Sequence, residues 1–201
     1  PIPIATAGQN TLIEKGQLEA TCAYGGNLVV FGDDASNAEA IYGRWRYGIS
    51  DKYNIAIDGI VSNSEYRSFK IGSQYRPFKF LVFDSGLGRG FGRGISRTGL
   101  SLGLTLDARF TKSGVFGIFS SVRTGHNLSQ ETDRSLPHNQ HLFCLGMSGY
   151  LDKKKHLYWF LEFGDVVHHR GNPLRVSGEG RQESYLGMGL SYRFRIPKKK
   201  Q

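Results

Sequence analysis

The chain of 201 residues contains no long hydrophobic run. A helix that crosses a membrane needs about 18–20 consecutive apolar residues, and no segment approaches that length. The mean hydropathy is −0.36, a value typical of soluble proteins. These observations exclude helical membrane spans only, because a chain of alternating apolar and polar strands also keeps a low average.

Cysteine is equally scarce, with only Cys22 and Cys144. Two cysteines are too few for a disulfide framework and lack the spacing of a zinc site. A single bridge remains open, although we favour two separate buried thiols. The pair His138 and His141 lacks a third metal ligand at a defined spacing. We therefore predict no cofactor and no bound metal.

The chain begins Pro1-Ile2-Pro3-Ile4, without an initiator Met or a signal peptide. This start fits a processed mature form from which an export signal has been removed. The formal net charge is +9, and the basic residues are dispersed apart from Arg89, Arg93 and Arg97 and the run 198–200. We do not expect nucleic-acid binding, because anionic lipopolysaccharide or a partner surface also suits such a charge.

Glycine is abundant, with 27 residues scattered through apolar stretches. Each glycine weakens a helix interior by about 1 kcal/mol, so this composition favours strands. Residues 184–194 have the sequence S-Y-L-G-M-G-L-S-Y-R-F, and residues 98–110 repeat the pattern. Successive strand side chains point to opposite faces, so each segment has one apolar face and one small or polar face.

The same alternation predicts ten strands. They are 17–31, 39–49, 53–61, 65–75, 78–84, 98–110, 114–123, 140–151, 156–167 and 183–194. Short turns (50–52, 76–77, 111–113, 152–155) alternate with connections that are mostly longer (32–38, 62–64, 85–97, 124–139, 168–182). Short periplasmic turns and longer extracellular loops characterise bacterial outer-membrane barrels. We therefore predict an all-β fold, a closed antiparallel up-and-down transmembrane barrel with both chain ends on the short-turn side.

Aromatic residues bracket several of these short turns. Amphipathic rings gather at the level of lipid headgroups, whereas β-propensity alone also places aromatics in strands. Their recurrence at one end of the strands favours an interfacial girdle, formed by Tyr47, Tyr53, Tyr75, Phe78, Phe110, Tyr150, Tyr158, Tyr192 and Phe194.

The hairpin Y-G-I-S-D-K-Y-N-I (47–55) and the final Tyr192-Arg193-Phe194 carry a family resemblance. Over residues 17–194 the sequence resembles small outer-membrane β-barrel proteins of Gram-negative bacteria. The resemblance implies an integral outer-membrane location, contact with membrane lipid and lipopolysaccharide, and recognition of the last strand by the barrel assembly machinery. It departs in one respect, because the family's chains usually end at the aromatic and seven residues follow Phe194 here. We predict that 1–16 form a periplasmic arm or plug and 195–201 a basic tail. Either terminus could contact a periplasmic protein partner.

The charged residues of the strands are expected to face the barrel interior. An arginine or lysine on the lipid face costs about 2–4 kcal/mol near the midplane. We therefore predict a lumen network formed by Arg44, Arg46, Asp58, Lys70, Asp107, Arg109, Glu162 and Arg193, with Gln74 beside it. Both signs are present, so the charges can pair. A barrel of this size is only slightly wider than one that side chains fill, which argues against a wide porin.

These features favour a non-enzymatic barrel: an envelope structural component, an anchor within a larger complex, or a narrow channel. The alternative is an outer-membrane hydrolase, a protease or lipid A-modifying enzyme, with its site at the extracellular rim. Its candidate residues are His126, His138, His141, Asp165, His168 and His169, and solvated loop histidines are the simpler explanation. A soluble lipocalin-like barrel would require apolar residues inside. The glycine-rich stretch 86–94 is either a flexible basic loop, an extension of two strands, or a loop folded into the lumen.

Overall fold

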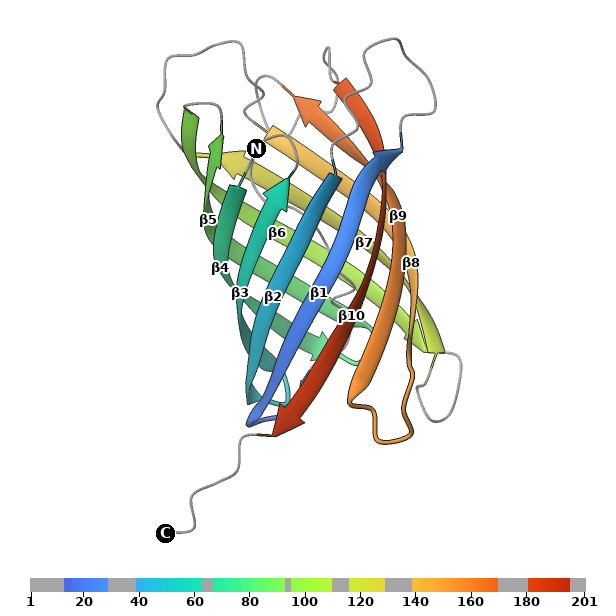
Figure 1. Ribbon diagram of the computed structural model, residues 1–201. Coiled ribbons are helices and arrows are strands. Elements are labelled where there is room, and N and C mark those ends of the chain that lie inside the picture. Colours follow the sequence, from blue (N-terminus) through green and yellow to red (C-terminus); the bar gives the residue numbers. More distant parts are fainter. Residues whose placement is uncertain are drawn as a thin grey trace.

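The computed structural model describes residues 13–28, 39–62, 67–92, 95–109, 116–128, 139–169 and 181–195. Over these ranges, ten antiparallel strands form a closed barrel in which β1 pairs with β10 (Figure 1). No helix long and apolar enough to cross a membrane occurs in the described ranges. The predicted fold class is confirmed. The strands are β1 (Gln17–Leu28), β2 (Glu39–Ser50), β3 (Tyr53–Ser62), β4 (Arg67–Phe78), β5 (Leu81–Gly92), β6 (Ile95–Arg109), β7 (Phe116–Asn127), β8 (Asn139–Tyr150), β9 (Leu157–His169) and β10 (Arg181–Arg195).

The two ends of the barrel differ in the length of their connections. Strands β2 and β3 are joined by 51–52, β4 and β5 by 79–80, and β8 and β9 by 151–156. Figure 1 shows the β8–β9 turn at the lower end of the barrel, where β10 also finishes. At the opposite end, most connections span more residues. By this asymmetry the lower end is the periplasmic end.

The predicted turn at Arg76-Pro77 is wrong, because both residues lie within β4 and the turn is formed by Lys79 and Phe80. The pairing of β4 with β5 is irregular between Tyr75 and Phe78. Proline lacks an N–H group and is tolerated in strands at such bulges. The bulge therefore lets the strand continue through a residue that usually marks a turn.

The predicted long loop 85–97 is also wrong, because β5 extends to Gly92 and β6 begins at Ile95. Of the alternatives for the glycine-rich stretch, extension of two strands is confirmed as far as Gly92; residues 93 and 94 lie outside the described ranges. Gly86 and Gly88 face the interior, and the side chain of Lys70 lies against both. Composition alone could not distinguish these strand glycines from those of a loop.

Burial in the barrel wall is the reverse of that in a soluble protein. On β2, Arg44 and Arg46 are each 2% exposed, whereas Ile41 and Trp45 are 60% and 54% exposed. The other strands repeat this pattern, with large apolar side chains outside. A soluble fold would leave this apolar belt in water, so the lipocalin-like alternative is wrong. The belt and the closed, even-stranded barrel identify the chain as an integral β-barrel of the outer-membrane type.

Large inward side chains lie over glycines of the neighbouring strand. The Phe119 ring covers Gly146, and Phe160 covers Gly189. A Cβ atom added at Gly189 would be 2.5 Å from the Phe160 ring. Each of these glycines therefore provides the volume that a large inward side chain occupies.

Residues 13–16 turn from the start of β1 into the periplasmic mouth of the barrel. Gly16 has a φ of 78°, which glycine adopts without a Cβ clash, and its N–H donates to the Gly48 carbonyl at 2.8 Å. The backbone of Ile13 and Glu14 lies against the inward face of Gly48, and the Ile13 side chain is fully buried. Residues 1–12 lie outside the described ranges, so a plug remains a prediction.

The two cysteines are free and lie on opposite sides of the wall. Cys144 is buried on the inner face, where its Sγ is 3.0 Å from Ser121 Oγ, and Cys22 is exposed on the outer face. The two thiols therefore form no bridge, and the expectation that both are buried is wrong for Cys22.

We predict that Gly146→Ala lowers the free energy of unfolding by about 1–3 kcal/mol, the usual range for overpacking. The new Cβ would overlap the Phe119 ring and lie 2.7 Å from the Leu161 carbonyl oxygen. Urea unfolding of the vesicle-inserted protein provides the measurement. Gly43→Ala is the control, because its Cβ would meet no atom within 4 Å. Equal stability of the two variants would contradict the volume argument.

Candidate functional site: the ionic lumen

The barrel interior is lined by ionic side chains drawn from nearly every strand. Most are at least nine-tenths buried. Because basic and acidic groups are close to balanced, the interior can neutralise itself. The basic members are Arg44, Arg46, Lys70, Arg109, Arg123 and Arg193, and the acidic members are Glu19, Asp58, Asp84, Asp107 and Glu162.

Glu19 on β1 is the centre of one cluster. Its carboxylate accepts hydrogen bonds from Arg46 on β2 and from Arg193 on β10, the latter from Nε at 2.6 Å. The two arginines stand opposite Glu19 on the two strands that flank it. The side chain of Glu19 is 1% exposed, so these contacts replace the water that a free carboxylate would bind. The cluster also joins the first and last strands.

Asp58 on β3 is the centre of a second cluster. Arg44 on β2 donates to its carboxylate, with Nη2 2.7 Å from Oδ2, and Lys70 on β4 places Nζ 3.0 Å from the same oxygen. Close by, Arg123 on β7 forms an ion pair with Asp84 on β5 at 3.1 Å. Asp58 and Asp84 therefore each have at least one cation in contact, as buried charges require.

Several hydrogen bonds reach past the neighbouring strand into the lumen. Arg46 Nη1 donates to Gln74 on β4 at 2.9 Å. Arg193 Nη1 donates to the Tyr150 hydroxyl on β8 at 2.8 Å. Arg109 on β6 donates to the Tyr158 hydroxyl on β9 at 3.3 Å. These side chains therefore extend along the inner face of the barrel past one or two intervening strands.

Tyr150 and Tyr158 were predicted as girdle residues, and this prediction is wrong. Tyr158 is fully buried and its ring, like that of Tyr150, lies under the Arg193 guanidinium. Both rings share the inward parity of Ser148 and Phe160 on their strands, and cation–π contact together with the hydroxyl acceptor stabilises them there. The presence of an aromatic residue next to a turn did not show whether its ring faces the lipid headgroups or the barrel interior.

The other predicted girdle residues are exposed at the periplasmic end of their strands. They are Tyr47, Tyr53, Tyr75, Phe78, Tyr192 and Phe194, and Phe110 lies outside the described ranges. Their location at the headgroups remains a prediction.

The eight predicted lumen residues all lie on the inner face of the barrel. The structure brings most of them into ion pairs, and Glu162 lies against Gly187. The sequence prediction omitted Glu19, Asp84 and Arg123. Strand parity could have identified Glu19 and Arg123, whereas the wrongly predicted loop 85–97 put Asp84 at a strand end.

The candidate catalytic residues at the extracellular rim do not form a described site. His126, His141 and Asp165 lie on the outer face of the wall, where Asp165 accepts a 2.6 Å hydrogen bond from Ser184. The side chains of His168 and His169 and all of His138 lie outside the described parts. Across the described residues, no three His, Cys, Asp or Glu side chains gather as a metal site.

The β8–β9 turn, outside the membrane-spanning segments, is held by Asp152. Its carboxylate accepts the Leu157 N–H at 2.7 Å. Desolvation raises the pKa of Asp152, and hydrogen bonds from the backbone of Leu157 and His156 lower it, with a net shift downward. The carboxylate therefore stays ionised near neutral pH and keeps its hydrogen bond to the turn.

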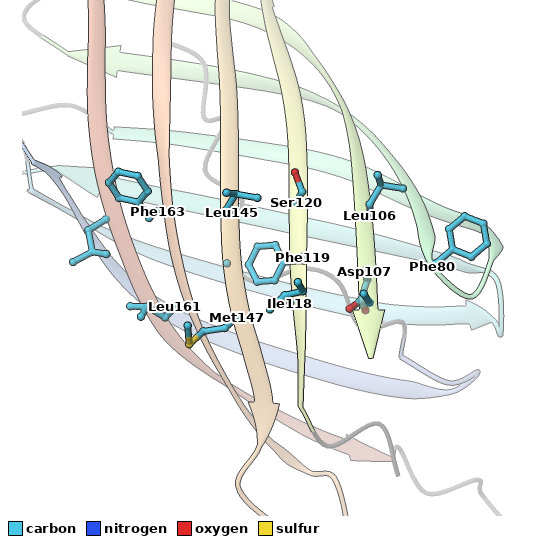
Figure 2. Close-up of a pocket in the computed structure, with 13 residues that line it drawn as sticks. Phe80, Leu106, Asp107, Ile118, Phe119, Ser120, Leu145, Met147, Leu161 and Phe163 are labelled. Atoms are coloured by element: carbon cyan, nitrogen blue, oxygen red, sulfur yellow. The ribbon is translucent and has the colours of Figure 1, made fainter. Parts of the chain in front are cut away.

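The outer wall carries an apolar groove of about 700 Å³ over strands β6 to β10. Figure 2 shows Ser120 between the larger Leu106 and Leu145, and the register places all three in one row. The small side chain leaves a hollow in the belt. In a bilayer, this groove faces acyl chains.

No protein-family model matches the chain, and no curated protein matches it in sequence. Three similar solved structures are a bacterial polysaccharide outer membrane secretin, the NanC porin and the N-terminal β-barrel domain of Pseudomonas aeruginosa OprF. Their sequence identities are 7%, 11% and 12%, and their TM-scores are 0.47, 0.43 and 0.38. The matches cover 90%, 87% and 90% of this chain and 99%, 98% and 98% of the others. Similarity at this level transfers no solute and no partner.

We predict that Glu19→Gln lowers the free energy of unfolding by about 3–5 kcal/mol, because it leaves two buried guanidinium groups without their anion. Glu14→Gln removes an exposed carboxylate that pairs with Arg195, and should change stability by about 0–1 kcal/mol. Urea unfolding in vesicles compares the two. Similar losses for both variants would show that burial does not determine the contribution of the Glu19 cluster.

Proposed function

We propose that the protein is a non-enzymatic structural component of the outer membrane whose lumen is closed by its own side chains. The hydrogen bonds that join non-neighbouring strands carry the proposal. Such bonds brace the wall from within, and they remove the open space that a diffusing solute would need.

The brace has physical consequences for stability. Glu19 with its two arginines ties β10, β1 and β2 together, and the Asp58 cluster ties β2, β3 and β4. Breaking either cluster in a low-dielectric interior would leave unpaired buried charge, which is strongly unfavourable. A barrel built in this way suits a rigid envelope element or an anchor better than a conduit.

Outer-membrane lipid is the partner that the apolar belt supports. We also propose that the outer row of β10, which ends in the exposed Tyr192 and Phe194, is the segment that the barrel assembly machinery recognises. Both proposals rest on exposed apolar side chains at positions where a soluble protein would have polar ones.

The test is conductance in a planar lipid bilayer. We predict that the protein gives little conductance, and that the triple variant Glu19→Ala, Arg46→Ala, Arg193→Ala raises it severalfold by emptying one level of the lumen without leaving an unpaired charge. Heat-modifiable gel mobility verifies that each variant is folded.

The matched control is Glu14→Ala with Arg195→Ala, which removes an exposed pair at the periplasmic end and should leave conductance unchanged. Large, stable conductance steps from the unmodified protein, equal to those of the triple variant, would refute a closed lumen.

A further inference from the structure

The extracellular edge of β4 and β5 carries two outward-facing arginines beside two phenylalanines. Arg67 stands opposite Phe91 and Phe69 opposite Arg89 in the strand register. All four side chains are exposed on the outer face. The arginines and the phenylalanines therefore occupy opposite diagonals of one four-residue patch, which we call the Arg67–Arg89 patch.

Contacts within this patch fix the rings and one guanidinium. The two phenyl rings stack with centroids 6.2 Å apart. The Arg89 guanidinium lies 5.3 Å from the centre of the Phe91 ring, and its Nε donates to the Ser96 hydroxyl at 2.8 Å. Arg89 is thus held against the wall through Nε, and its terminal nitrogens form no hydrogen bond with the described residues.

The charge of the patch is not neutralised by the described part of the chain. By contrast, Arg44 and Arg123 in the lumen and Arg195 at the periplasmic end each contact a carboxylate. Neither Arg67 nor Arg89 forms an ion pair with a described carboxylate. These two exposed cations therefore have no anionic partner among the described residues and can accept an anion from outside the chain.

The surface on the periplasmic side of the patch indicates the chemistry of the rest of the ligand. The next row toward the periplasm, Ile71 and Leu87, is 60% and 54% exposed and entirely apolar. One row further, the hydroxyls of Ser73 and Ser85 form a hydrogen bond with each other at 3.2 Å, which lowers the polarity that this row presents to hydrocarbon. A ligand that fits both surfaces has an anionic head and acyl chains.

We propose that the Arg67–Arg89 patch binds a phosphate group of lipid A, the phosphorylated glycolipid of the outer leaflet, with an acyl chain along the two phenyl rings and the apolar row beneath. Guanidinium groups pair with phosphate through strong, charge-assisted and often bidentate hydrogen bonds. The patch lies at the end with the longer connections, which is the extracellular end. The inference depends on that orientation and not on whether the lumen conducts.

The experiment measures binding of lipid A to the full chain in detergent micelles by native mass spectrometry. Arg67→Gln with Arg89→Gln should weaken lipid A binding by about tenfold or more, since it removes both charge-assisted contacts to phosphate. The matched control is Lys52→Gln with Lys79→Gln, which removes the same charge from exposed periplasmic turns and should leave the affinity within about twofold.

A second arm uses only the unmodified protein, so it does not depend on the folding of a variant. Lipid A should bind more tightly than dephosphorylated lipid A and than phosphatidylglycerol. Equal affinity for dephosphorylated lipid A would overturn the phosphate contact. Equal affinity for phosphatidylglycerol would overturn the assignment to lipid A, and equal loss in the two double variants would overturn the location.

Discussion

The structure depends on one constraint. Hydrocarbon cannot solvate the ionic side chains of a membrane-spanning wall, so these side chains must neutralise one another. Outside the barrel is hydrocarbon, so the carboxylate of Glu19 must find its partners within the lumen, and it finds them on both flanking strands. The same requirement determines the register, because a shift of one residue would turn every arginine of a strand into lipid. The pairing of β1 with β10 that closes the barrel also brings Arg193 to Glu19. Closure of the barrel and neutralisation of these charges therefore occur together.

Space for these long side chains comes from the glycines. Lys70 extends toward Asp58 because Gly86 and Gly88 leave room beside it, and Phe119 fills the volume over Gly146. Glycine thus has two functions in this chain. Gly16 adopts a positive φ. In the strands, glycine leaves space for a large side chain of the neighbouring strand. Inside the barrel, a large side chain on one strand packs against a glycine of the next strand, which has no side chain. The lumen is therefore densely packed without being uniformly apolar.

Much of this architecture could be predicted from the sequence, because alternation of apolar and charged residues reports directly on which face meets lipid. The inward position of Arg44 and Arg46 follows from parity, and the strand number and the closed barrel follow from parity together with the alternation of short and longer connections. What sequence reasoning missed depends on three-dimensional contact. The hydrogen bond between Tyr158 and Arg109 joins side chains three strands apart, and the continuation of β4 through Pro77 depends on a bulge opposite β5. Glycines that accommodate a neighbour resemble glycines of a loop until that neighbour is known.

The orientation of the wall can be tested directly with the two native tryptophans, Trp45 and Trp159. Both belong to outward rows, and Trp45 is 54% exposed in the middle of the apolar belt. In vesicles of lipids brominated along the acyl chain, tryptophan emission should be strongly quenched, whereas aqueous iodide should have little effect. Strong quenching by iodide, with brominated chains ineffective, would contradict an apolar exterior and with it an ionic lumen.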